Sequence, residues 1–346
     1  MSEYTYQTGT VLIGDLLLES GKLLKGAELR YELSGRKTGP VILVCHALTG
    51  SHLSVGTEKQ PGWWRELIGP SGYINTKGFL VLTFNVLGGC DGSTGPASVN
   101  PETGEQYRMA FPELTVRDIV KAQYQALEEL GVSSLEAVIG GSLGGMQALE
   151  WGLLYPSFVK KVFLLASTPY FSDYGIAFNT IGKTAIISDP NWREGKYERP
   201  ADVLGLRVAR MAGMVTYRSP ELFQKRFNRS KASEEIYQVE SYLAYQGEKL
   251  ANRFDPNSYL YLMAAMNSHD IGRDRGGWKE AASQFQPQLI ALGYTNDLIY
   301  PPVLIKEFAH LVNNSTYYEI ETLFGHDGFL TEFDKWGNLI SRHLEN

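Results

Sequence analysis

The chain has 346 residues, 43% of them hydrophobic and 20% charged, with a formal net charge of −6. This is the composition of a globular protein, and its acidic balance gives no general attraction to nucleic acid or to an anionic membrane. The two cysteines, Cys45 and Cys90, provide no disulfide framework, so we expect a reducing cytoplasm as the compartment. No metal motif such as His-Glu-x-x-His or Cys-x-x-Cys occurs, and no apolar run approaches the roughly 20 residues of a membrane span.

The first half of the chain alternates between strand and helix patterns. Alternating polarity predicts antiparallel strands before residue 36, whereas short apolar runs predict strands that are buried on both faces of a sheet. The apolar runs are residues 41–45, 79–84, 135–139 and 162–166. Residues 115–130 have helical spacing, with Thr115 suited to the N-cap and Asp118 to position N3.

The alternation stops at Ser167, and helical runs take its place at 201–214, 234–251 and 257–267. It resumes with a strand at 288–292, a helix after Pro302, a strand near 317–320 and a final helix at 328–343. We therefore predict an α/β fold with a mostly parallel central sheet and flanking helices. Its core domain comprises residues 1–167 and 287–346, and residues 168–286 form a helical insertion that serves as a lid.

The hexapeptide Gly140-Gly141-Ser142-Leu143-Gly144-Gly145 lies between an apolar strand and a helical run. Strand, Gly-x-Ser-x-Gly and helix in this order are typical of a nucleophile elbow, a sharp turn that exposes a serine at the top of a sheet. The Leu143 N–H would then face the oxygen that becomes negative when Ser142 attacks a carbonyl. The alternative is a glycine-rich turn with a packing role, because a bare Gly-x-Ser-x-Gly also recurs by accident.

A nucleophilic serine needs a base, and the base needs an acid that orients it. On this kind of fold they follow in the order serine, acid, histidine. Of six histidines, His326 lies in a glycine-flanked loop after the last strand, and Asp297 follows the preceding core strand. Asp297 could instead cap a turn, and His326 could be an ordinary loop histidine. Asp327 competes as the acid, but its position next to His326 leaves it better suited to bind a substrate ammonium.

Two further features of the sequence suggest binding groups. The loop after the first apolar strand, His46-Ala47-Leu48, can supply the second oxyanion donor through the Leu48 N–H, or can be a tight loop that packs beneath the elbow. Residues 193–232 hold ten Lys or Arg against four Asp or Glu, which suits an anionic ligand but also a solvated helical face. Arg210 lies in an otherwise apolar helical run and therefore needs a carboxylate partner.

Several long motifs resemble the homoserine O-acetyltransferase family. They are Cys-His-Ala-Leu-Thr-Gly at 45–50, Pro-Gly-Trp-Trp at 61–64, Asn-Val-Leu-Gly-Gly-Cys-Asp-Gly-Ser-Thr-Gly-Pro at 85–96, the elbow with its helix at 140–151, and Gly-His-Asp-Gly-Phe-Leu at 325–330. The resemblance extends over about residues 31–336. It implies an α/β-hydrolase core with a helical lid, usually as a homodimer, and acetyl transfer from acetyl-CoA to the homoserine hydroxyl in methionine biosynthesis. Acetyl-CoA is then a substrate, and we expect no cofactor and no metal.

The resemblance also implies roles for particular residues. The family's catalytic serine, aspartate and histidine match Ser142, Asp297 and His326. Its amino-acid-binding aspartate matches Asp327, and a lid arginine that binds the substrate carboxylate matches Arg210, with Arg218 as the second choice.

The expected mechanism is ping-pong, with an acyl group held on the serine between two half-reactions. The residues leave other activities open. Relatives of the same family use succinyl-CoA or acylate serine, and an esterase or thioesterase would carry the same three catalytic groups. A binding protein that has kept the fold alone is a further alternative.

Overall fold

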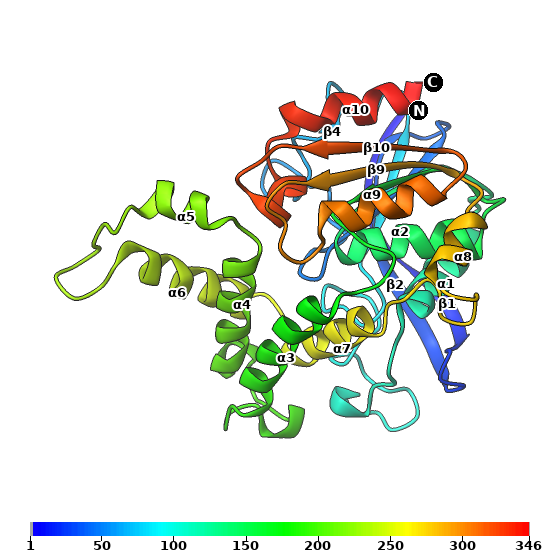
Figure 1. Ribbon diagram of the computed structural model, residues 1–346. Coiled ribbons are helices and arrows are strands. Elements are labelled where there is room, and N and C mark those ends of the chain that lie inside the picture. The colour runs from blue at the N-terminus through cyan, green and yellow to red at the C-terminus, as the bar shows by residue number, and fades with distance from the viewer. Residues whose placement is uncertain (1–2, 346) are drawn as a thin grey trace.

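The computed structural model describes residues 3–345, so Met1, Ser2 and Asn346, which the predicted core domain includes, lie outside it. An eight-stranded sheet in the order β1-β2-β6-β3-β7-β8-β9-β10 forms the centre of the molecule (Figure 1). Its strands are β1 (Tyr4–Leu17), β2 (Leu23–Arg36), β3 (Val41–Cys45), β6 (Leu80–Phe84), β7 (Leu135–Gly141), β8 (Val159–Leu165), β9 (Gln288–Tyr294) and β10 (Ser315–Ile320). From β6 to β10 every neighbouring pair is parallel, which confirms the predicted mostly parallel α/β sheet.

The apolar strands are buried on both faces, as their composition predicts. In β3, Leu43 and Cys45 pack into one hydrophobic core, whereas Ile42 and Val44 pack into the other. Successive side chains of a strand point to opposite faces, so a continuous apolar run satisfies both cores at once.

Helices cover the two faces of the sheet (Figure 1). On the face of Leu43 lie α1 (Val116–Glu129), α2 (Leu143–Leu154), α8 (Trp278–Ser283) and α9 (Pro302–Leu311). The other face is covered by α10 (Phe333–Glu345) and by the segment with the short strands β4 (Ile68–Gly69) and β5 (Ile74–Asn75). Thr115 and Asp118 form the capping box of α1, as predicted.

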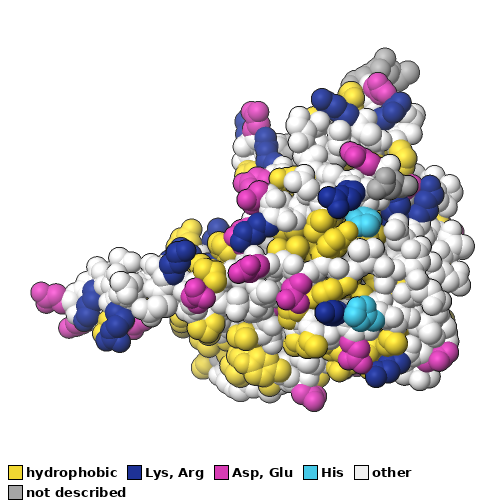
Figure 2. Space-filling model, turned by 45° about the horizontal axis from the view of Figure 1, so that its top comes forward, with side chains coloured by type: hydrophobic (Ala, Val, Ile, Leu, Met, Phe, Trp, Pro, Cys, Tyr) yellow, Lys and Arg dark blue, Asp and Glu magenta, His cyan; other side chains and the backbone are white. Residues whose placement is uncertain are grey.

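The segment between β8 and β9 is helical in the part of the chain that the structure describes. It contains α3 (Asp173–Ile187), α4 (Leu204–Thr216), α5 (Pro220–Phe227), α6 (Gln238–Ala251), α7 (Pro256–Asn267) and α8, with the short 3-10 helices η2 (Arg193–Gly195) and η3 (Pro200–Asp202). Helices α5 and α6 form an arm that projects from the body (Figure 1), and Figure 2 shows cationic and anionic side chains mixed along it. That these helices act as a lid, and that the domains divide at residues 167 and 287, stay predictions.

The last helix begins later than the sequence pattern predicts. Residues Gly325–Leu330 form a 3-10 helix, η4, and α10 starts at Phe333 rather than at Gly328. Between them, Thr331 is extended and Glu332 has a left-handed φ of 48°, which interrupts the helix. None of the helices in the described residues is both long and apolar enough to cross a membrane.

Candidate active site

The turn between β7 and α2 places Ser142 at the carboxyl edge of the sheet. Its backbone has φ 59° and ψ −126°, a strained combination for a residue with a side chain. The flanking glycines are required by close packing. A Cβ on Gly140 would lie 2.2 Å from the carbonyl oxygen of Gly144, and a Cβ on Gly144 would lie 2.1 Å from that of Cys45. The local geometry is therefore that of a nucleophile elbow.

His326 and Asp297 form a buried pair beside the elbow. The Nδ1 atom of His326 lies 2.8 Å from Oδ2 of Asp297, and both residues are about 5% exposed or less. The other carboxylate oxygen of Asp297 accepts the N–H groups of Ile299 and Tyr300, each at 2.9 Å. Because the carboxylate accepts the proton on Nδ1, Nε2 of His326 is left free to act as a base.

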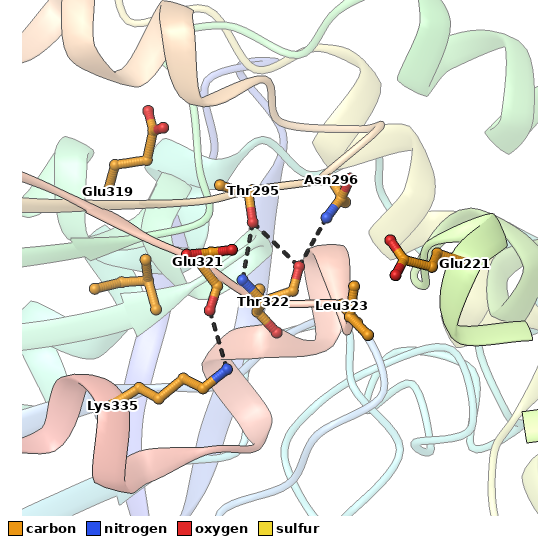
Figure 3. A pocket seen from close by; sticks show the side chains of 9 residues that line it. Glu221, Thr295, Asn296, Glu319, Glu321, Thr322, Leu323 and Lys335 are labelled. Atoms are coloured by element: carbon orange, nitrogen blue, oxygen red, sulfur yellow. Dashed lines mark hydrogen bonds between the residues drawn. The ribbon is translucent and has the colours of Figure 1, made fainter. Parts of the chain in front are cut away.

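Hydrogen bonds between neighbouring loops set the distance between these two residues (Figure 3). The Thr322 carbonyl accepts from the side chains of Thr295, at 3.1 Å, and Asn296, at 2.8 Å, while the Thr322 N–H donates to Thr295 at 2.8 Å. Thr295 and Asn296 lead to Asp297, whereas Thr322 leads to His326. The ends of two adjacent parallel strands thus bring together groups that are far apart in the sequence.

The Ser142 hydroxyl donates a long hydrogen bond of 3.5 Å to the Tyr300 hydroxyl. Among residues 3–345 it makes no hydrogen bond to His326, although both residues line one cavity. The Tyr300 ring stacks on the His326 ring with centroids 4.9 Å apart. The structure therefore brings the three predicted catalytic residues together with the serine turned toward Tyr300. Such contacts often tighten only when substrate binds.

The two predicted oxyanion donors lie close to Ser142 in different segments of the chain. Leu143 is the first residue of α2, where the N–H groups have no partner within the helix and the helix dipole favours negative charge. Leu48 follows β3 and lines the same cavity as Ser142. In the described part of the chain, neither N–H has a hydrogen-bond acceptor. Their role in catalysis stays a prediction.

The cavity at Ser142 is small and is covered by the helical insertion. Its volume is about 30 Å³, which is enough for one or two water molecules. Side chains of the insertion that line it include Phe171, Asn179, Ala209, Tyr217, Tyr259 and Met263. A larger groove of about 890 Å³ lies nearby and is lined by Glu221, Glu319, Glu321 and Lys335, but none of the three predicted catalytic residues lines it (Figure 3).

The predicted substrate-binding residues have different surroundings. The Arg218 Nε donates to Oδ2 of Asp327 at 2.9 Å, and both side chains are largely buried. Asp327 is therefore already paired, and its predicted role toward an ammonium stays untested. Arg210 lies over the Tyr217 ring, 5.6 Å from the centroid. No carboxylate within residues 3–345 pairs with Arg210, so the partner that its apolar setting calls for is not supplied by the described chain.

Tyr300 and Tyr217 are two residues of the site that the sequence did not predict. Both rings contact His326, and the Asp327 N–H donates to the Tyr217 carbonyl at 3.0 Å. Tyr300 could have been suspected, because it follows Asp297 by three residues in the same loop. Tyr217 belongs to the insertion, and its contact with the core depends on tertiary packing that no local pattern reveals.

No group of three or more potential metal ligands occurs in the described residues, and the prediction that the protein needs no metal stays open.

The fold class of the chain follows from its similarity to known proteins. Residues 40–333 match the family model of the alpha/beta hydrolase fold. A protein of Symbiobacterium thermophilum named homoserine O-acetyltransferase is 45% identical, with 95% of this chain and 92% of that protein covered. The chain belongs to the homoserine O-acetyltransferase family.

Two solved structures extend this comparison. Homoserine O-acetyltransferase from Staphylococcus aureus is 34% identical, with a TM-score of 0.84 and coverage of 99% of this chain and 96% of that one. Esterase E22 is 26% identical, with a TM-score of 0.90 and coverage of 98% and 100%. The same architecture therefore also occurs in a protein that is named an esterase.

Three buried histidines lie outside the His326–Asp297 pair. Burial lowers the pKa values of His46 and His52 from 6.5 to about 4 and that of His269 from 6.5 to about 3. Desolvation disfavours the imidazolium, so all three rings are neutral in the folded protein near neutral pH.

We expect the free energy of unfolding to decrease as the pH is lowered from 6.5 to 4. In this window the unfolded chain takes up protons on His46, His52 and His269, whereas the folded chain does not. Each histidine can therefore reduce stability by up to about 1.4 kcal/mol per pH unit. Urea denaturation across this range measures the slope. His269→Asn should reduce it, and His310→Asn, at an exposed position on α9, should leave it unchanged. A stability that rises on acidification would contradict this account.

Proposed function

We propose that this protein transfers an acetyl group from acetyl-CoA to the hydroxyl of L-homoserine, a step of methionine biosynthesis. The observation that carries the proposal is the buried His326–Asp297 pair beside a strained Ser142. The chain that contains them is 45% identical to a protein named homoserine O-acetyltransferase. The pair can remove a proton from a hydroxyl, and the elbow presents one at the edge of the sheet.

In the first half-reaction, Ser142 turns from Tyr300 toward His326, whose Nε2 accepts the hydroxyl proton. The serine oxygen attacks the thioester carbon, and the N–H groups of Leu48 and Leu143 stabilise the oxyanion. The C–S bond then breaks, and the CoA sulfur takes the proton from His326. The product is an acetyl ester on Ser142.

In the second half-reaction, the homoserine hydroxyl gives its proton to His326 and its oxygen attacks the acetyl ester. The oxyanion forms again between the same two N–H groups, and the bond to Ser142 breaks as the serine oxygen recovers the proton. The acetyl group leaves as O-acetylhomoserine. Asp297 keeps the imidazole in one orientation and stabilises its charged form in both halves.

The substrate carboxylate is assigned to Arg210 and the ammonium to Asp327. Arg210 has no carboxylate partner in the described chain and contacts Tyr217, which lines the cavity at Ser142. Asp327 adjoins His326, and its pairing with Arg218 leaves its second oxygen for the ammonium. Arg218 is the second choice for the carboxylate.

The helical insertion serves as a lid that keeps water from the acetyl-enzyme, because hydrolysis would waste the donor. The cavity of about 30 Å³ supports this, since acetyl-CoA fits only when the covering helices move. We also propose a cytoplasmic homodimer without a bound cofactor. Support for the dimer comes from exposed apolar side chains on α3 and α4, namely Tyr174, Ile181, Leu204 and Val208. Figure 2 shows hydrophobic side chains gathered near the base of the arm.

An esterase is the second candidate, because esterase E22 shares the architecture at a TM-score of 0.90. Initial rates distinguish the two functions when acetyl-CoA and succinyl-CoA are each supplied with homoserine, with serine and with no acceptor. We expect acetyl transfer to homoserine to be fastest, and Ser142→Ala to reduce it by at least about 10³-fold while the protein stays folded. Release of free acetate at the same rate with and without homoserine would identify an esterase or thioesterase instead.

Arg210→Met should raise the KM for homoserine with little change in kcat, because a lost hydrogen-bonded charge pair weakens binding by about 10- to 100-fold. Arg226→Met is the matched control. Arg226 is also an arginine of the insertion above an aromatic ring, Tyr242, but it is exposed on the arm. If Arg218→Met raised the KM and Arg210→Met did not, the carboxylate would belong to Arg218.

A further inference from the structure

The loop after β3 contains a second histidine whose contacts bear on the reaction. Leu48, the proposed oxyanion donor, shares a peptide group with Ala47. The Ala47 carbonyl is held twice, because His46 Nδ1 lies 2.7 Å from it and the Gly50 N–H donates to it at 2.9 Å. In a trans peptide the C=O and the N–H point in opposite directions. A fixed Ala47 carbonyl therefore fixes the direction of the Leu48 N–H.

The other nitrogen of His46 determines where the ring carries its proton. The Val86 N–H lies 3.0 Å from Nε2, and a backbone N–H can only donate. The side-chain nitrogen of Asn85 lies 3.2 Å from the same atom. Nε2 is consequently an acceptor without a proton, and Nδ1 is the nitrogen that carries one. This N–H donates to the Ala47 carbonyl, and no solvent competes for it because the ring is buried.

A chain of hydrogen bonds between buried side-chain amides connects His46 to α2, the helix that follows Ser142. The His46 carbonyl accepts from Gln147 at 3.1 Å, and Gln147 in turn accepts from Gln123 at 2.7 Å. Gln123 accepts from the indole N–H of Trp151 at 2.8 Å. Gln147 and Trp151 belong to α2, whose first residue provides the other oxyanion donor. Both donors are thus positioned from one helix.

We propose that His46 is a positioning residue for acyl transfer, because its Nδ1–H fixes the Ala47–Leu48 peptide with the Leu48 N–H directed at the acyl oxygen. This inference rests on the proposed function, since an oxyanion donor matters only if Ser142 is acylated. A purely structural histidine would fill the core and accept from Val86. The two roles depend on different ring nitrogens, so they can be separated by substitution.

Two amide variants separate the two nitrogens. His46→Asn keeps an N–H donor at the position of Nδ1, whereas His46→Gln places its amide near Nε2, where it accepts from Val86 but does not reach Ala47. The measurement is the burst rate with p-nitrophenyl acetate, which reports acylation of Ser142 without any acceptor. We expect His46→Gln to slow the burst by about 10²-fold or more and His46→Asn by less than about tenfold. Thermal unfolding confirms that each variant is folded.

Equal burst rates in the two variants, or an effect on the unfolding temperature alone, would show that His46 has a structural role only. If His46→Gln does not fold, His46→Asn alone provides the test, because it keeps a donor at the position of Nδ1 and loses the acceptor at Nε2. A burst slowed by about 10²-fold or more in a folded His46→Asn variant would overturn the proposal. Failure of the proposed function looks different, since the wild-type protein would then show no burst, or a burst without acetyl transfer to homoserine.

Discussion

The left-handed backbone at Ser142 is the constraint on which the rest of the site depends. A strained residue of this kind costs on the order of 1–3 kcal/mol and persists only where its surroundings enforce it. Here β3, β7 and α2 approach so closely that neither Gly140 nor Gly144 has room for a side chain. This turn lifts the hydroxyl out of the sheet and starts α2 beneath it, so one piece of backbone positions both the proposed nucleophile and one proposed oxyanion donor.

The order of the strands in the sheet brings Asp297 and His326 to the same edge as this turn. Asp297 and His326 follow β9 and β10, which are parallel neighbours, and hydrogen bonds from Thr295 and Asn296 to Thr322 hold the two loops together. The insertion leaves the core after β8 and returns before β9, so its helices cover the same edge of the sheet. Chain topology, rather than sequence proximity, assembles the site.

The parts of this arrangement that depend on local patterns could be predicted. Apolar runs predicted β3 and β6 to within a residue, and Thr115 with Asp118 predicted the start of α1. Chain order alone placed Ser142, Asp297 and His326 at one edge. What depends on tertiary contacts could not be predicted. The pairing of Arg218 with Asp327 joins segments 109 residues apart, and the strands β4 and β5 are two residues each, too short for a periodic signal.

The central claim is that Ser142 carries the acetyl group between the two half-reactions. Mass spectrometry of the protein after mixing with acetyl-CoA in the absence of homoserine tests it most directly. The account predicts one added acetyl group on the peptide that contains Ser142, and its loss as O-acetylhomoserine when homoserine is added. An unmodified Ser142 in a protein that still transfers acetyl groups, or an acetyl group on another residue that homoserine removes, would contradict it.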